Sequence, residues 1–296
     1  MKSILILYNQ SKMNAYEYAQ NAYRLISKAK IQPQVMTSQE FVERDQEKIS
    51  AEYLKQFEAI VVLGGDGTIL GVARKIAHYP RPMMGINLGK FGFLTSSGSH
   101  ELEEAITSLI SNQYNVSMRY MLEARVARKV EGQERAEVVF KALALNEALF
   151  TLSRPGRVVE ILVGEEHHPI LAYRADGLII STSTGSTGHS LSAGGPIVEP
   201  HLPALVITPV SPHSLFNRPL VVDGEKKLYI AFRENPHELV LILDGQVEFP
   251  LYSTDHVHIR RSPHQIPMIS MPERTFAQIL NLKFNLGSAL YDYGNP

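Results

Sequence analysis

The hydrophobic pattern of the first hundred residues alternates between short apolar runs and longer stretches with helical spacing. The apolar runs predict buried strands at residues 3–8, 34–37, 59–63 and 82–88. The intervening pattern predicts helices at residues 14–29, at 38–57 with Ser38 as the cap, around Ile69 and Ala73, and at 101–110. Strands that alternate with helices predict a parallel sheet covered by helices on both faces, with ligands at the carboxyl ends of its strands.

From about residue 118 the pattern changes to short runs that often alternate and are rich in β-branched residues. They predict strands at residues 122–130, 138–142, 158–163, 177–181, 204–208, 220–222, 227–232, 239–243 and 256–260. Residues 131–134 predict a hairpin turn, and residues 272–282 return to helical spacing. We therefore expect an α/β domain over residues 1–100, a β-rich domain of the all-β kind over residues 101–271, and a C-terminal segment, residues 272–296, that packs back onto the first domain.

The stretch Gly64-Gly65-Asp66-Gly67-Thr68 lies between the third predicted strand and the helix that follows it. Its glycines leave backbone N–H groups bare, so that Gly64, Gly65 and Thr68 can face a phosphate at the positive end of the helix. Asp66 does not suit a simple phosphate site, because a carboxylate repels phosphate unless it holds a metal or takes a proton. The stretch indicates chemistry at Asp66 or, equally well on spacing alone, an ordinary turn.

A second glycine-bearing loop, residues 87–95, follows the fourth predicted strand. Lys90 and the ring of Phe93 fit the lining of a nucleotide cleft, and a linker whose aromatic residues pack beneath a domain boundary is the alternative. The chain contains no G-x-x-x-x-G-K-[ST] sequence, which excludes the Walker-type nucleotide hydrolases.

Two further stretches carry polar groups inside apolar surroundings. Asn146 and Glu147 interrupt an apolar run, and ribose hydroxyls would satisfy such a buried amide and carboxylate, although a strand-edge pair that faces water explains the same pattern. Residues 181–196 consist mostly of Ser, Thr and Gly between apolar strands, which suits a base edge, a ribose or a pyrophosphate. A serine nucleophile lacks support, because no G-x-S-x-G elbow is present.

The composition narrows the range of partners. The 296 residues include 29 Lys and Arg and 30 Asp and Glu, a net charge of −1, so no basic excess indicates nucleic acid or an anionic membrane surface. The chain has no cysteine, which fits a reducing compartment, and its 11 histidines show no metal-ligand spacing. No apolar run reaches the ~20 residues of a membrane span, and none is typical of a secretory signal. We expect a cytoplasmic protein with no metal site made by its own side chains.

Taken in order, the motifs resemble those of the NAD kinase family, specifically its bacterial type. The blocks that carry the resemblance are GGDGT (64–68), NLGKFGFLT (87–95), the Asn146-Glu147 pair, RADGLIISTSTGSTGHSLSAGGPIVEP (174–200), PVSPHSLFNRPLVV (209–222) and DGQ (244–246). GGDGT is shared with diacylglycerol, sphingosine and 6-phosphofructo-kinases, whereas the long Ser/Thr/Gly block is much more specific. The resemblance implies an N-terminal α/β domain with a Rossmann-like parallel sheet and an all-β, sandwich-like C-terminal domain.

The resemblance also implies transfer of the γ-phosphoryl group of ATP to the 2′-hydroxyl of the adenosine ribose of NAD, which gives NADP. By the motifs, Asp66 would be the base and Gly67 part of its turn. The dinucleotide would be bound by Phe93, by the pair Asn146 and Glu147, by the cleft residues Arg157, Arg174 and Asp176, by a wall formed by Thr187, Gly188, His189, Ser190, Leu191 and Ser192, and by Gln246, which closes the site. The family implies a divalent metal such as Mg²⁺ on the nucleotide and a homo-oligomer, a tetramer or a dimer.

The chain departs from the family pattern at a few positions. Gly188-His189 stands where the family usually has Ala-Tyr, so an imidazole replaces any stacking by the tyrosine ring. Ser183 replaces a usual proline, and residues 278–284 differ from the usual ending. Two other functions are compatible with GGDGT: a lipid or sugar kinase, and a non-catalytic nucleotide sensor.

Overall fold

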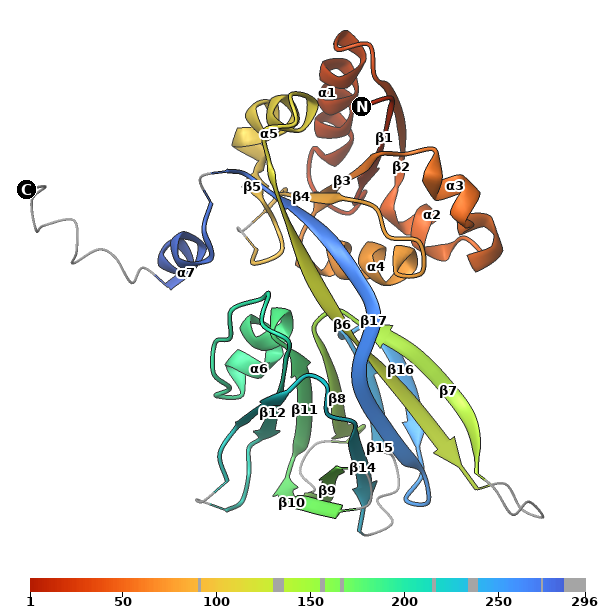
Figure 1. The fold of residues 1–296 in the computed structure, drawn as a ribbon, viewed down its shortest axis with the longest axis vertical. Helices are drawn as coiled ribbons and strands as arrows, with labels where there is room; N and C mark the ends of the chain where they lie inside the picture. The colour runs from red at the N-terminus through yellow and green to blue at the C-terminus, as the bar shows by residue number, and fades with distance from the viewer. Residues whose placement is uncertain are drawn as a thin grey trace, which may run out of the picture. The chain divides into compact units, whose positions relative to one another are not determined.

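The computed structural model describes residues 1–89, 92–129, 136–154, 158–165, 168–214, 217–233, 239–272 and 274–284 (Figure 1). The chain divides into two compact units, one formed by Met1–Met118 with Ile266–Pro296 and the other by Arg119–Gln265. The expected hairpin turn at residues 131–134 lies outside the described residues. In the part of the chain that is described, no helix is long and apolar enough to cross a membrane.

Unit 1 is built on a parallel sheet with the strand order β2-β1-β3-β4-β17. Its strands are β1 (Ser3–Tyr8), β2 (Gln32–Thr37), β3 (Ala59–Gly64), β4 (Met83–Asn87) and the end of β17 (His256–Ser270), whose Met268 and Ile269 pair with β4. The short β5 (Ser97–Gly98) also pairs with β4 in the parallel direction. Because parallel strands are covered on both faces, β3 is buried along its whole length.

Helices cover the two faces of this sheet (Figure 1). On one face α1 (Ala15–Lys28) and α5 (Leu102–Ile110) pack through Ala19, Ala22, Ile106 and Leu109 against the strands. Figure 1 shows α2 (Ser38–Glu43), α3 (Ala51–Lys55) and α4 (Asp66–Ile76) on the other side of the strands. The α5 helix belongs to the core of unit 1, so unit 1 extends to Met118, beyond the expected boundary at residue 100.

The single helix expected over residues 38–57 is wrong in this structure. The segment forms α2, a 3-10 helix (Gln46–Ile49) and α3. Thr37, and not Ser38, caps α2, because its Oγ1 accepts the Glu40 N–H at 3.1 Å. Ser50 Oγ in turn accepts the Tyr53 N–H at 3.2 Å and starts α3. These local caps compete with a continuous helix.

Unit 2 is an antiparallel β domain. One sheet has the order β13-β12-β11-β8-β15-β16, formed by Leu220–Asp223, Ala204–Val210, Gly177–Thr182, Glu147–Leu152, Leu239–Leu243 and Val247–Leu251. The other contains β10 (His168–Ala175), β9 (Val159–Glu165), β14 (Leu228–Phe232) and β17, and also β6 (Asn115–Arg128) paired with β7 (Glu137–Ala144).

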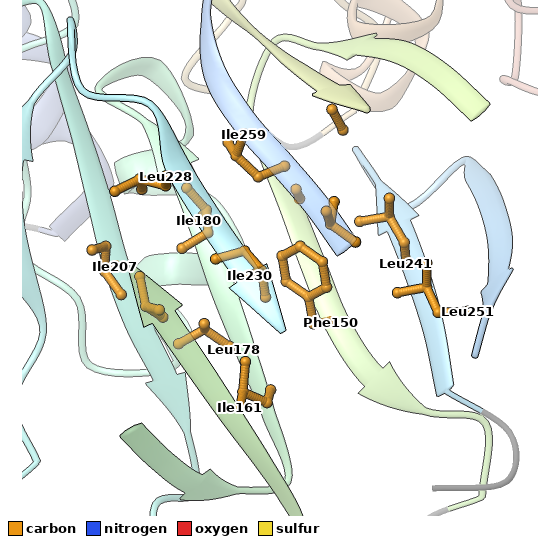
Figure 2. Close-up of a cluster of buried hydrophobic side chains, with 14 of the residues drawn as sticks. Phe150, Ile161, Leu178, Ile180, Ile207, Leu228, Ile230, Leu241, Leu251 and Ile259 are labelled. Atoms are coloured by element: carbon orange, nitrogen blue, oxygen red, sulfur yellow. The ribbon is translucent and has the colours of Figure 1, made fainter. Parts of the chain in front are cut away.

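The two sheets of unit 2 enclose one hydrophobic core. Figure 2 shows Phe150 of β8 beside Ile230 of β14, with Leu241 of β15 and Ile259 of β17 nearby, and all four side chains are fully buried. Side chains from both sheets therefore interdigitate, as in a β-sandwich. The predicted fold class, an α/β domain with a mostly parallel sheet followed by an antiparallel β domain, is confirmed.

The sequence pattern missed β8, β10 and β16 of unit 2 and the two-residue β5 of unit 1. β10 and β16 are edge strands that contain Pro169 and Pro250, which an edge tolerates and a central strand does not. β8 begins at Glu147, so its polar start concealed a strand whose other residues are largely apolar.

The tail contacts unit 1 through a few side chains. Arg274 pairs with Glu101. The ring of Phe284, in α7 (Phe276–Phe284), lies 5.8 Å from the ring of Phe93. No residue of α7 is buried, so this helix adds little to the core.

Candidate functional site

The candidate catalytic turn of unit 1 joins β3 to α4. Gly65 is the N-cap residue, with φ −123° and ψ −177°, and Asp66 is the first residue of the helix. Thr68 shapes the turn, because its Oγ1 accepts a hydrogen bond from Asn9 Nδ2 at 3.0 Å. A Cβ on Gly64 would lie 2.5 Å from Thr68 Oγ1, so glycine lets the end of β3 approach the first turn of α4 this closely.

The Asp66 carboxylate is held by the loop that follows β4. Its Oδ2 accepts the backbone N–H of Phe93 at 2.9 Å, and its Oδ1 accepts that of Leu94 at 3.2 Å. The loop comes so close that a Cβ on Gly92 would lie 1.8 Å from Asp66 Oδ1. The carboxylate is therefore fixed at the N-terminus of α4, where the helix dipole favours a negative charge.

Two features of this turn were not foreseen. Phe93 contributes its backbone N–H, while its ring lies against Phe284 and 5.3 Å from Lys283 Nζ. Asn9 was not among the predicted residues. Its position directly after β1, at the same sheet edge as the end of β3, could have identified it as a site residue. Lys90 lies outside the described residues.

The candidate dinucleotide site of unit 2 centres on the turn between β7 and β8. The Asp244 carboxylate accepts the N–H groups of Leu145, Asn146 and Glu147 at 3.0, 2.8 and 3.2 Å. The N–H of Asp244 donates to the carbonyl of Glu147 at 3.0 Å. Asp244 and Gly245 have φ of 51° and 64°, the left-handed values of a tight two-residue hairpin turn.

A second set of contacts holds the β7–β8 turn from β11. Thr182 donates its hydroxyl to the carbonyl of Leu145 at 2.6 Å and its N–H to that of Asn146 at 2.8 Å. The Gly185 N–H donates to Thr182 Oγ1 at 3.0 Å. A Cβ on Gly185 would lie 2.1 Å from the Asn146 carbonyl oxygen, so this approach requires glycine. The sequence did not single out Thr182 or Asp244, because their partners are distant in the chain.

The side chains of Asn146 and Glu147 carry buried atoms without a partner. Asn146 Oδ1 and Glu147 Oε2 make no hydrogen bond within the described part of the chain. Glu147 is 7% exposed, and burial, with the neighbouring Asp244 carboxylate, raises its pKa to about 8. A Cβ on Gly188 would lie 3.2 Å from Asn146 Nδ2 and 3.3 Å from Glu147 Oε2. Such unsatisfied groups beside a residue without a side chain suit a polar ligand.

The Ser/Thr/Gly block uses many of its hydroxyls within the fold. Ser190 Oγ lies 2.8 Å from Thr208 Oγ1, and Thr187 Oγ1 donates to the Thr184 carbonyl at 3.2 Å. His189 and Ser192, at the ends of the short helix α6 (His189–Ser192), are exposed, and Leu191 between them is half-buried. The block surrounds the β7–β8 turn mainly through its backbone and Gly188.

The remaining predicted residues do not all gather at this turn. Gln246 is exposed in the β15–β16 turn, next to the segment that carries Asp244. Arg174 and Asp176 are exposed. Asp176 directly precedes β11 and Thr182 ends it, six residues further on, which is about 20 Å at the rise of a strand. Within one chain, unit 2 therefore separates Asp176 from Asn146 and Glu147. Arg157 lies outside the described residues.

The raised pKa of Glu147 predicts a pH-dependent stability. The carboxyl is neutral in the folded chain below about pH 8 but ionises near its ordinary value, 4.5, when unfolded. The contribution of Glu147 to the free energy of unfolding is therefore fully present below pH 4.5. It is lost as the pH rises towards 8, by up to about 1.4 kcal/mol per pH unit. We expect Glu147→Gln to flatten the fall in unfolding free energy between pH 5 and 8, measured by urea titration. Glu248→Gln, at an exposed position of β16, is the control, and equal slopes in both variants would contradict this assignment.

Both units of the chain match known proteins. The model of the ATP-NAD kinase N-terminal domain matches residues 4–114, and that of the ATP-NAD kinase C-terminal domain matches residues 145–271. The NAD kinase of Heliobacterium modesticaldum is 42% identical over 236 residues, which cover 79% of this chain and 81% of that protein. The NAD kinase of Natranaerobius thermophilus is 32% identical over 289 residues, 97% of this chain and 99% of that protein.

Solved structures show the same fold. The yeast NADH kinase complexed with NADH has a TM-score of 0.80 at 20% identity and covers 97% of this chain and 88% of its own. The NAD kinase of Archaeoglobus fulgidus in complex with ATP has a TM-score of 0.72 at 22% identity and covers 96% and 99%. Two family models and a relative that matches over nearly the whole length lead to one conclusion: the chain belongs to the ATP-NAD kinase family.

Proposed function

We propose that Asp66 is the general base of this chain's reaction, in which the γ-phosphoryl group of ATP passes to the 2′-hydroxyl of the adenosine ribose of NAD. As a member of the ATP-NAD kinase family, the chain is a phosphotransferase that uses ATP and NAD and produces NADP. The observation that carries the role of Asp66 is its carboxylate, fixed by the N–H groups of Phe93 and Leu94.

The proposed role of Asp66 as a base follows from the acceptor capacity that its carboxylate retains. Each oxygen accepts one backbone N–H and keeps a lone pair that can take the proton of the acceptor hydroxyl. Loss of that proton makes the ribose oxygen a better nucleophile as its bond to the γ-phosphorus forms and the bond to the ADP oxygen breaks. Phosphoryl transfer depends mostly on positioning and charge stabilisation, so a rigidly held base is well suited to it.

The phosphates of ATP are proposed to lie at the N-terminus of α4. Gly64, Gly65 and Gly67 keep Cβ atoms away from this end of the helix, and the dipole of an 11-residue helix favours an anion there. The Thr68 hydroxyl already binds Asn9, so Thr68 contributes by shaping the turn.

The acceptor NAD is proposed to bind through Asn146 and Glu147, whose unpartnered buried atoms match ribose hydroxyls. Gly188 leaves the room beside them, and the segment Thr187 to Ser192 forms the wall against the adenine. His189 is exposed and offers an imidazole to the ligand. Gln246, in the turn next to Asp244, closes this side of the site.

A divalent cation such as Mg²⁺ is part of the proposal. Within the described ranges, no three His, Asp or Glu side chains gather to hold a metal. Mg²⁺ commonly keeps its waters and binds substrate phosphates with one or two carboxylates, so this chain fits an ion carried by ATP. When bound, the ion neutralises charge on the phosphates.

The cellular setting and assembly are also proposals. We propose a cytoplasmic enzyme, because a chain without cysteine suits a reducing compartment. We propose a homo-oligomer, a tetramer or a dimer. The distance of about 20 Å along β11 between Asp176 and Thr182 supports it, since Asp176 can then serve the site of another copy.

Replacement of Asp66 by Asn tests the base. We expect kcat for NADP formation to fall by ~10²–10⁴-fold, because the proton acceptor is lost, while the Kd for NAD changes little. NADP formation and NAD binding are measured in parallel. Asp45→Asn, an exposed carboxylate of the same unit, is the matched control. Turnover at the unmodified rate with intact NAD binding would contradict the base role.

Replacement of Gly92 by Ala tests the positioning of that base. The new Cβ would meet Asp66 Oδ1 and push the carboxylate or the loop aside, so we expect kcat to fall by ~10²-fold in a folded protein. Gly89→Ala is the control, because its Cβ would make an ordinary contact at 3.6 Å with Asn87 Oδ1. Equal kcat values for the two alanine variants would refute the close fit.

A further inference from the structure

Asp244 lies outside the set of residues that bind ATP or NAD in the proposal above, yet it makes four hydrogen bonds to the β7–β8 turn. Its carboxylate accepts three consecutive backbone N–H groups, those of Leu145, Asn146 and Glu147. Its own N–H closes the arrangement by donating to the Glu147 carbonyl. Asp244 directly follows β15, has φ of 51°, and reaches with its side chain the turn that leads into the paired strand β8.

The arrangement brings two carboxyl groups together in a buried place. Glu147 is 7% exposed and Asp244 is 5% exposed. The ionised form of Asp244 is favoured, because three N–H donors stabilise it. Glu147 Oε2 has no hydrogen-bond donor within the described part of the chain, so nothing there stabilises a second negative charge. Two adjacent carboxyl groups in such a place favour one ionised and one neutral partner.

No other charged group compensates Glu147 among the described elements that surround it. The flanking strand β11 and the 3-10 helix Thr184–Thr187 carry no titratable side chain. On the outer elements, His189 of α6, Glu137 of β7 and Glu248 of β16 are exposed, and Lys141 of β7 pairs with Glu123 at 3.1 Å. Burial first, and then the negative charge of Asp244, raise the pKa of Glu147 to about 8.

We propose that Asp244 is a positioning residue that fixes the Asn146-Glu147 turn and holds Glu147 neutral, so that Glu147 binds a ribose hydroxyl of NAD as a hydrogen-bond donor. The proposal rests on the proposed role of these two residues in NAD binding. A neutral carboxyl offers one donor and keeps an acceptor, and the Asn146 Oδ1 atom adds a second acceptor. Together they match hydroxyl groups that both donate and accept.

The consequence is an alkaline limit to NAD affinity. As the pH rises through about 8, Glu147 loses the proton that it donates, and the Kd for NAD rises tenfold per pH unit. Asp244→Asn removes the neighbouring negative charge, so Glu147 ionises at a lower pH and the alkaline rise in Kd begins at a lower pH. A role of Asp244 in the fold alone would raise Kd at every pH and leave the midpoint unchanged.

The experiment measures the Kd for NAD by calorimetry from pH 6 to 9.5 in the full chain and in four variants, with NADP formation measured on the same preparations. Glu147→Gln is permanently neutral and keeps a donor and an acceptor, so we expect it to lack the alkaline rise in Kd. We expect Asp244→Asn to shift the alkaline rise in Kd to lower pH. The double variant that combines Asp244→Asn and Glu147→Gln should show no such rise. Glu248→Gln is the control.

The outcomes separate this inference from the function on which it rests. The inference is overturned if the Kd of the unmodified chain does not depend on pH, or if Glu147→Gln keeps the rise in Kd at alkaline pH. In either case, continued formation of NADP would still support the proposed function. Failure of the unmodified chain to bind NAD or to form NADP overturns both. If Asp244→Asn does not fold, the comparison of Glu147→Gln with the unmodified chain still decides.

Discussion

Each unit depends on one aspartate carboxylate that satisfies consecutive backbone N–H groups of a neighbouring loop. Asp66 does so for Phe93 and Leu94, and Asp244 does so for Leu145, Asn146 and Glu147. Backbone donors that leave regular structure must find acceptors, and a charged oxygen is a strong one. The turns that carry the chemistry are thereby held in one conformation before any ligand arrives.

The carboxylates of Asp66 and Asp244 differ in the hydrogen-bond acceptor capacity that remains to them. Asp66 accepts two N–H groups and stands at the start of α4, so its oxygens retain capacity for a proton. Asp244 accepts three and is almost fully buried, which leaves it a structural and electrostatic role towards Glu147. Glycines allow a close approach at each turn. A side chain at Gly92 would collide with the Asp66 carboxylate, and one at Gly185 would collide with the Asn146 carbonyl.

The sequence predicted what depends on local pattern. The range of β1, the fold class and the place of Asp66 at a strand-to-helix turn follow from apolar periodicity and turn chemistry. The pattern failed where local caps divide residues 38–57 and where the edge strands β10 and β16 contain proline. It did not reveal the role of Asp244, because the backbone partners of that carboxylate lie 97 to 99 residues away. It grouped Asp176 with Asn146, although the length of β11 separates them.

The division of labour between the two aspartates is tested most directly by single-turnover kinetics at saturating NAD and ATP. We expect Asp66→Asn to lower the rate of NADP formation by ~10²-fold or more, since the chemical step loses its base. We expect Asp244→Asn to keep that rate within a few fold while its NAD affinity falls. A single-turnover rate of Asp66→Asn equal to that of the unmodified chain would contradict the assignment of Asp66 as the base.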